Sequence, residues 1–165
     1  MEILHAPWRI DYILSEKAPP SGTSLFATIA QSNDDEAHYV VRRERTCFAL
    51  LNAYPYNGGH LLVVPYKQAA DWSELTDQEL CDLMQLTRRA QQALTKAMSP
   101  HGFNIGLNLG KVAGAGILDH LHIHVVPRWN GDTNFMPVLG ATTVVPEALK
   151  ETAAKIRAAF ASLPD

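Results

Sequence analysis

The chain has 165 residues, of which 47% are hydrophobic and 19% charged, a composition typical of one soluble globular domain. Its formal net charge of −3 excludes a general positive field that would attract nucleic acid or an anionic membrane. The chain has no apolar run near the roughly 18 residues of a membrane span, and its start does not resemble a signal peptide. We therefore expect a cytoplasmic protein without nucleic-acid or membrane partners.

The first 37 residues are the least regular part of the chain. A short apolar piece, "TSLFATIA" (23–30), lies there between Pro- and Gly-containing residues and the polar run "QSNDDEA". We predict an N-terminal arm with a short helix over 1–37, followed by a single domain over 38–165.

Three segments with strand character follow, over 38–44, 46–54 and 60–66. The turn sequence "PYNGG" separates the second segment from the third, and Asn-Gly between β-branched and aromatic residues is a strong hairpin signal. The three segments are predicted to form an antiparallel meander.

The hydrophobic period then changes to that of a helix over 71–98. Thr76, with Glu79 three residues later, forms the sequence pattern of a capping box. One long amphipathic helix is expected, ending before "SPHG".

Two more strands are predicted at 103–110 and 120–128, joined by a glycine-rich segment, and a final helix runs from Pro146 to about Leu163. Strands and helices do not alternate regularly along this chain. The order favours an α+β fold, with a five-stranded antiparallel sheet, one long helix and a C-terminal helix.

The stretch "DHLHIHVVPRW" places three of the seven histidines at two-residue spacing: His120, His122 and His124. On a strand these side chains share one face, while the intervening aliphatic residues face the helix. Those aliphatic residues are Leu121, Ile123 and Val125.

Three interpretations of the histidines are open at this point. They could be chance polar positions on a surface strand. Two of them could bind a metal ion, with His60, His5 or a carboxylate completing the ligands. Alternatively, one imidazole attacks phosphorus while its neighbours donate to anionic oxygens, and His122, with an imidazole on each side, is then the natural nucleophile. His5, His38 and His101 have no partner by spacing and are expected to be ordinary surface or turn residues.

The glycine-rich run before the histidines fits an anion site. Gly110, Gly114 and Gly116 can turn backbone N–H groups toward a phosphate, and Lys111 adds positive charge. Without a Walker pattern, a flexible hairpin loop is the competing interpretation.

These residues resemble a known family. "HLHIHVV" matches the motif of the histidine triad (HIT) superfamily of nucleotide hydrolases and transferases, and "FALLNAYPYNGGHLLVVP" resembles its strand-turn-strand segment, so the resemblance covers about 46–130. The segments "APWRIDYI" and "PRWNGDTNFMPV" further resemble the branch that contains diadenosine tetraphosphate (Ap4A) phosphorylases. The resemblance implies a HIT-like fold, usually as a homodimer, acting on dinucleoside polyphosphates or related nucleotide conjugates.

The resemblance also implies roles for individual residues. His122 would be the nucleophile that forms a nucleotidyl-histidine intermediate, and His120 would support it and the leaving group. His124 and His60 would hold phosphate oxygens, and Asn52 the ribose hydroxyls. Phosphate contacts would come from Asn108 and the backbone around Ala115 and Gly116. Apart from the resemblance, the charge of Lys111 would add to the phosphate site, and Trp129, directly after "VVPR", would close the site or touch a base, or simply pack at the end of a core strand.

Two departures from the family pattern matter. Many bacterial relatives bind structural zinc through a CxxC motif and a histidine after the "VVP" strand; here those regions read "SLFATIAQ" and "YKQ". We therefore predict no metal site and no tightly bound cofactor, with any Mg²⁺ arriving on the substrate's phosphates. The glutamine that small dinucleoside hydrolases place before the triad is also missing, which leaves phosphorolysis open.

Two alternative functions are kept beside the cleavage of dinucleoside polyphosphates. The chain could be a nucleoside phosphoramidate hydrolase, or a nucleotide-binding module with little turnover.

Overall fold

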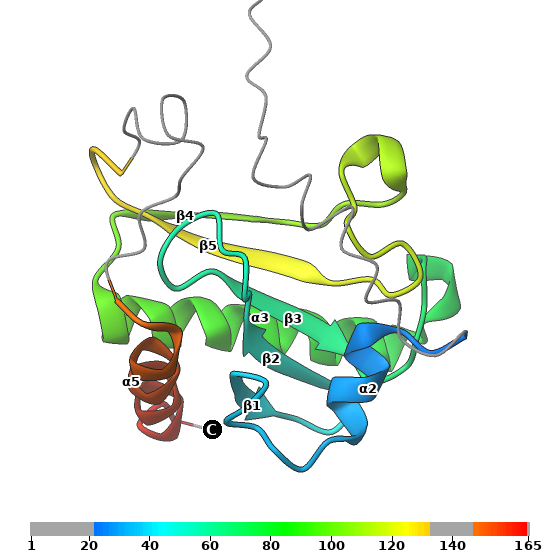
Figure 1. Ribbon diagram of the computed structural model, residues 1–165, viewed down its shortest axis with the longest axis horizontal. Coiled ribbons are helices and arrows are strands. Elements are labelled where there is room, and N and C mark those ends of the chain that lie inside the picture. Colours follow the sequence, from blue (N-terminus) through cyan, green and yellow to red (C-terminus); the bar gives the residue numbers. More distant parts are fainter. Residues whose placement is uncertain (1–21, 133–146, 165) are drawn as a thin grey trace, which may run out of the picture.

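The computed structural model describes residues 22–132 and 147–164, and the fold is shown in Figure 1. The strands in this part of the chain are β1 (Val40–Arg43), β2 (Cys47–Leu51), β3 (Leu61–Pro65), β4 (Gly102–Gly106) and β5 (Ile123–Arg128). The α-helices are α2 (Leu25–Gln31), α3 (Asp77–Met98) and α5 (Leu149–Ala161). Two short 3-10 turns, η1 (Trp72–Glu74) and η2 (Lys111–Ala113), complete the described elements.

The strands form one sheet in the order β1-β2-β3-β5-β4, and every neighbouring pair is antiparallel. This confirms the predicted five-stranded antiparallel sheet. The predicted strand at 120–128 was too long at its start, because β5 begins at Ile123. Before it, the backbone N–H of Leu121 donates to the carbonyl oxygen of Ala69, in the loop after β3, at 2.7 Å.

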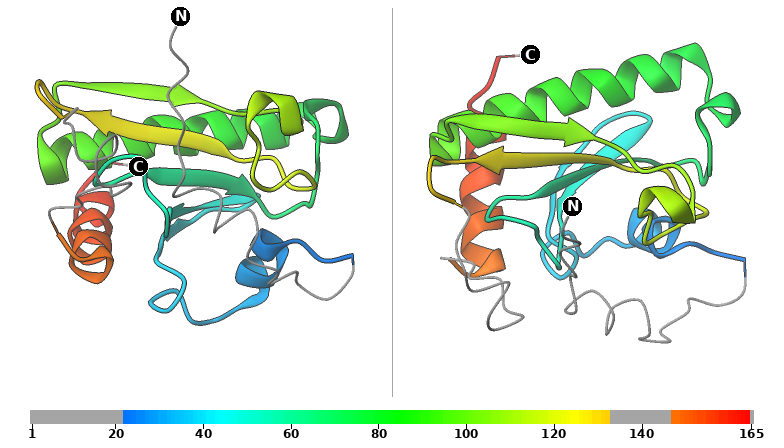
Figure 2. Two further views of the ribbon diagram at one scale, coloured as in Figure 1. Left: turned by 45° about the horizontal axis from the view of Figure 1, so that its top comes forward. Right: turned by 90° about the horizontal axis from the view of Figure 1, so that it is seen from above.

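The long helix α3 packs on one face of the sheet, with α5 against α3 and β1 (Figures 1 and 2). The main core lies between them, and Leu121, Ile123 and Val125 belong to it, as strand parity predicted. Thr76 caps α3 through the expected capping box with Glu79. The helix therefore begins at Asp77, and the residues from Asp71 form the separate turn η1.

The short helix α2 covers the opposite face of the sheet, as the right-hand view of Figure 2 shows. Phe26 and Ile29 of α2 join a second buried cluster with side chains from the first three strands. Those strand residues are Val40, Phe48, Leu50, Leu62 and Val64. Because both faces are covered, every residue of β2 and β3 is buried.

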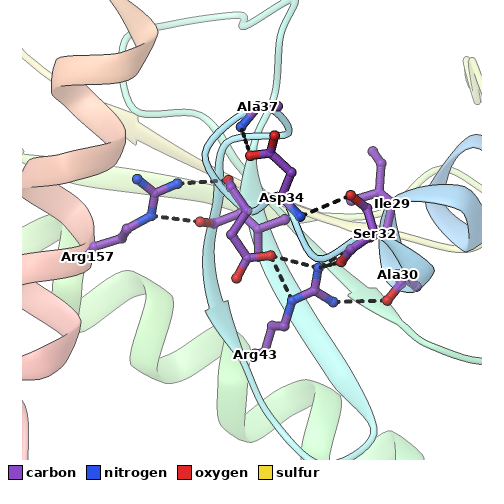
Figure 3. Close-up of polar contacts among 9 residues, drawn as sticks. Ile29, Ala30, Ser32, Asp34, Ala37, Arg43 and Arg157 are labelled. Carbon is purple, nitrogen blue, oxygen red and sulfur yellow. Dashed lines mark hydrogen bonds and ion pairs between the residues drawn. The ribbon is translucent and has the colours of Figure 1, made fainter.

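Two arginines tie α2 and the loop that follows it to the rest of the fold (Figure 3). The guanidinium of Arg43 donates to the carbonyl oxygens of Ile29, Ala30 and Ser32, at the C-terminal end of α2. Arg157 of α5 donates to the carbonyl oxygens of Asp35 and Val40 at 2.9 and 2.8 Å. These contacts fix the segment that leads into β1, and residues 37–39 of that segment line the cavity described below.

Among residues 22–132 and 147–164, every helix is too short or too polar to cross a membrane. The predicted start of the last helix at Pro146 lies outside the described residues, as does most of the predicted arm.

Candidate active site

A cavity of about 460 Å³ opens on the α2 face of the sheet, a size within the range of roughly 300 to 1,000 Å³ typical of small-molecule sites. One wall is apolar and comes from α2, β2 and the loop before β5; it includes Leu25, Phe26, Ile29, Leu50 and Ile117. The polar part of the lining contains His122, His124 and Asn52. The cavity therefore combines an apolar wall with imidazoles that can form hydrogen bonds with a ligand.

The ring of His122 has a defined orientation. Its Nδ1 lies 2.9 Å from the carbonyl oxygen of His120, and a carbonyl only accepts, so Nδ1 carries the proton and Nε2 the lone pair. Burial lowers the pKa of His122, with the bond to His120 opposing that shift. The side chain is 7% exposed and lines the cavity, so it offers a neutral, nucleophilic nitrogen there.

His120 is fully buried and serves a different purpose from its neighbour. Its Nε2 lies 2.8 Å from the carbonyl oxygen of Pro65, and its Nδ1 lies 2.5 Å from the hydroxyl oxygen of Ser24. Burial lowers the pKa of His120, which keeps the ring neutral. Both ring nitrogens of His120 are bonded to protein groups, so the ring has no nitrogen left for a ligand. His120 contributes to the site through its backbone carbonyl, which orients His122.

His60 and His124 form a hydrogen-bonded pair whose tautomers can be deduced. The backbone N–H of Tyr56 donates to Nδ1 of His60 at 3.1 Å, so the His60 proton is on Nε2. That Nε2 lies 2.9 Å from Nδ1 of His124 and donates to it. The proton of His124 is therefore on Nε2, where it can be donated to an oxygen of a ligand. Burial lowers the pKa of His60 to about 3, and the nearby histidines add to the shift, so His60 is neutral at neutral pH.

The structure brings some of the predicted site residues together and separates others. Asn52 and Gly116 line the cavity with His122 and His124, and His60 lies directly behind them. The predicted contacts Asn108, Lys111, Ala115 and Trp129 are not among the described residues that line it. Asn108 donates to the carbonyl oxygen of Gly114 at 3.4 Å, and Lys111 is exposed on η2.

The glycine-rich loop uses several of its N–H groups internally. The amides of Ala113 and Ala115 both donate to the carbonyl oxygen of Gly110, and that of Gly114 donates to the carbonyl oxygen of Lys111. Gly110 and Gly114 have φ values of 81° and 89°, which explains why glycine stands at both positions. In this conformation, the loop contributes Gly114, Gly116 and Ile117 to the cavity wall.

Sequence reasoning missed three residues at the cavity. His38, expected to be an ordinary surface or turn residue, lines it, and so do Tyr54 and Tyr56. The ring of Tyr56 lies 4.7 Å from that of His60 and 5.7 Å from that of His124, centroid to centroid. The aromatic residues within "NAYPYNGG" were the available signal for the tyrosines, whereas His38 has no motif around it. His101 is a turn residue as expected, and His5 lies outside the described residues.

Comparisons with known proteins agree with this site. Residues 33–131 match the family described as HIT domain. The chain is 41% identical over 170 residues to "AP-4-A phosphorylase" of Mycobacterium tuberculosis, covering 99% of this chain and 87% of the relative. It is 36% identical over 93 residues to the asymmetrical bis(5'-nucleosyl)-tetraphosphatase of Schizosaccharomyces pombe, covering 56% of this chain and 50% of that protein. The crystal structure of a zinc-bound histidine triad family protein from Mycobacterium smegmatis matches with a TM-score of 0.69 and 25% identity, covering 86% of this chain and 96% of the other.

The zinc-bound relative raises the question of whether this chain could hold the same metal. The corner where α2 meets the loop after β3 contains Ser24, Ala27, Gln68 and His120. A hydroxyl, a methyl and an amide cannot replace the thiolate and imidazole ligands that zinc prefers, and both nitrogens of His120 are already bonded. Among the described residues, no group of three or more His, Cys, Asp or Glu side chains could hold a metal ion. The residues at this corner do not fit a zinc site.

Proposed function

Because the chain belongs to the HIT family and is a homologue of Ap4A phosphorylase, we propose that it cleaves dinucleoside polyphosphates through a nucleotidyl-histidine intermediate. The observation that carries this proposal is the fixed tautomer of His122. Its Nδ1–H is held by the carbonyl of His120, so the lone pair of Nε2 is available at the cavity that its side chain lines. A nucleotide base fits the apolar wall beside it.

In the first step, Nε2 of His122 attacks the α-phosphorus of the substrate. An N–P bond forms as the P–O bond to the rest of the polyphosphate breaks, so Ap4A leaves AMP on His122 and releases ATP with the bonding electron pair. The hydrogen bonds from Tyr56 to His60 and from His60 to His124 leave the proton of neutral His124 on Nε2. This Nε2–H donates a hydrogen bond to an oxygen of the reacting phosphate.

In the second step, an acceptor attacks the same phosphorus and the N–P bond breaks. Inorganic phosphate as acceptor releases ADP, and water releases AMP; in both cases His122 returns to its neutral state. The 41% identity to a protein named for phosphorolysis supports phosphate as the acceptor. We further propose that Mg²⁺ arrives on the substrate's phosphate oxygens and has no site of its own in the protein.

The test is incubation of the purified protein with Ap4A, with and without inorganic phosphate, and separation of the products by anion exchange. ATP plus ADP that appear only with phosphate would establish a phosphorylase, and ATP plus AMP without it a hydrolase. If neither arm gives product while a nucleoside phosphoramidate is hydrolysed, the dinucleotide substrate is wrong. Binding of AMP without turnover of any substrate would leave only the binding-module function.

We also propose a homodimer, formed at the β4 edge of the sheet. Ile105 of β4 is 48% exposed there, and a strand edge with an exposed apolar side chain favours pairing with a second copy. Light scattering of the wild type and of Ile105→Lys tests this, with a dimer converted to monomer as the expected result.

We also propose a cytoplasmic location for the protein. Cys47 and Cys81 are both free thiols, which supports a reducing compartment.

A further inference from the structure

We propose that Ser24 is a positioning residue for the reaction, and that its hydroxyl group holds the ring of His120 so that the backbone of His120 can orient His122. Ser24 precedes α2 and is 96 residues away from His120 in the chain. The inference rests on the proposed role of His122 as nucleophile and assigns a function to the start of α2.

Ser24 is 1% exposed, and its polar atoms are fully used. Its backbone N–H donates to the side-chain carbonyl of Gln68 at 3.1 Å, and its hydroxyl oxygen accepts from the backbone N–H of Ala27 at 3.0 Å, which caps α2. The hydroxyl proton is left for Nδ1 of His120, at 2.5 Å. The direction of this bond follows from the other side of the ring, where Nε2–H donates to the carbonyl oxygen of Pro65 and leaves Nδ1 as an acceptor.

His120 needs this support because it lies outside the sheet. The strand β5 begins at Ile123, so the hydrogen bonds of the ladder do not hold the backbone of His120. Its ring is instead fixed at both nitrogens, by Ser24 on one side and by Pro65 on the other. The carbonyl of the same residue accepts the Nδ1 proton of His122.

A second contact from α2 reaches the same two rings. The ring of Phe26 lies 5.5 Å from that of His120 at an interplanar angle of 86°, and 5.1 Å from that of His122. Phe26 follows Ser24 by two residues, so one end of a short helix contacts both histidines. The start of α2 is therefore part of the support of the nucleophile as well as a cover for the sheet.

Loss of the hydroxyl would leave Nδ1 of His120 as a buried acceptor without this donor. The residue would then be held by the bond from its ring to Pro65 and by the bond of the following amide, that of Leu121, to Ala69, so the backbone of His120 could shift and carry the carbonyl that fixes the tautomer of His122. A misplacement of about 1 Å at a reacting group can cost roughly 100-fold in rate. Ser24 is not among the described residues that line the cavity, so loss of its hydroxyl removes no direct contact with the substrate, and KM should change little as long as α2 keeps its place.

The experiment compares Ser24→Ala, Ser24→Thr and the control Thr76→Ala in full-length protein with Ap4A as substrate. Ser24→Ala removes both the cap of α2 and the bond to His120, whereas Ser24→Thr keeps both. Thr76→Ala removes the cap of another helix, α3, which packs on the other face of the sheet. We expect Ser24→Ala to lower kcat about 10- to 100-fold with KM within about twofold, Ser24→Thr to recover most of kcat, and Thr76→Ala to lower stability with kcat unchanged.

Urea unfolding of each variant separates catalysis from folding. The inference is overturned if folded Ser24→Ala keeps kcat within about twofold of the wild type, if Ser24→Thr loses as much kcat as Ser24→Ala, or if Thr76→Ala loses as much kcat as Ser24→Ala. Turnover by His122→Ala would instead overturn the proposed function. The two failures are therefore distinguishable.

Discussion

Leu61 and Leu62 are neighbours in β3, yet they belong to different parts of the molecule. Leu61 points into the aliphatic core beneath α3, whereas Leu62 points to the α2 face and lines the cavity. Along β5 the same alternation separates Ile123, in the main core, from His124, at the cavity. One face of the sheet therefore supplies stability and the other supplies the reactive groups, and substitutions on the two faces should have different effects.

The largest effect is expected on the α2 face, for His122→Ala. Removal of the nucleophilic imidazole should lower kcat by at least about 10⁴-fold, because no other described group offers a neutral ring nitrogen held in the same way. Steady-state kinetics with Ap4A measures the loss, and calorimetry with AMP should show that nucleotide binding is largely kept.

The matched control for that substitution is His101→Ala. His101 is an exposed turn residue whose Nδ1 accepts from the backbone N–H of Asn130, and it lies outside the cavity. Its loss should leave kcat unchanged. A residual rate of His122→Ala within tenfold of the wild type would disprove covalent catalysis by this residue.

On the α3 face, the expected effect is on stability. Leu83 is 0% exposed in the main core, so Leu83→Ala should lower the free energy of unfolding by about 2–5 kcal/mol. The neighbouring Met84 is 54% exposed, and Met84→Ala should change it by no more than about 0.5 kcal/mol. Urea unfolding measures both, and kcat per folded molecule should stay near the wild-type value. A large loss of kcat in folded Leu83→Ala would show that the two faces are coupled.

The buried histidines should make stability depend on pH. Burial holds the pKa of His60 at about 3 in the folded protein, below its usual 6.5, so between these values only the unfolded chain takes up the proton. Stability is therefore lost as pH falls through 6.5 toward the folded pKa, by about 2 kcal/mol for His60 between pH 7 and pH 5. His60→Gln should weaken this dependence, measured by urea unfolding at pH 7 and pH 5. Equal losses in the wild type and the variant would contradict a neutral, buried His60.

Much of this division could be predicted from the sequence, because it follows from local patterns. Period-two alternation placed Leu121, Ile123 and Val125 in the main core, and the capping box identified Thr76 as the N-cap of α3, although the helical pattern was extended back to residue 71. The sequence could not show that α2 covers the other face, since that depends on contacts such as Ser24 with His120, 96 residues apart. For the same reason it did not place His38, a turn residue as expected, at the cavity, and it put all three histidines on one face of a strand, whereas His120 precedes β5 and is buried.

The smallest effect is expected for Lys111→Ala, which tests a contact predicted from the sequence and not brought to the cavity by the structure. Lys111 lies exposed on η2, and the amides around it are bonded within the loop. A solvated charge outside the cavity lining is screened by salt. Its loss should change KM for Ap4A by no more than about threefold, with kcat unchanged, and the change should shrink at high salt. A tenfold rise in KM would mean that the loop changes conformation and closes on the polyphosphate during the reaction. Lys111 would then be a phosphate contact, as the sequence predicted.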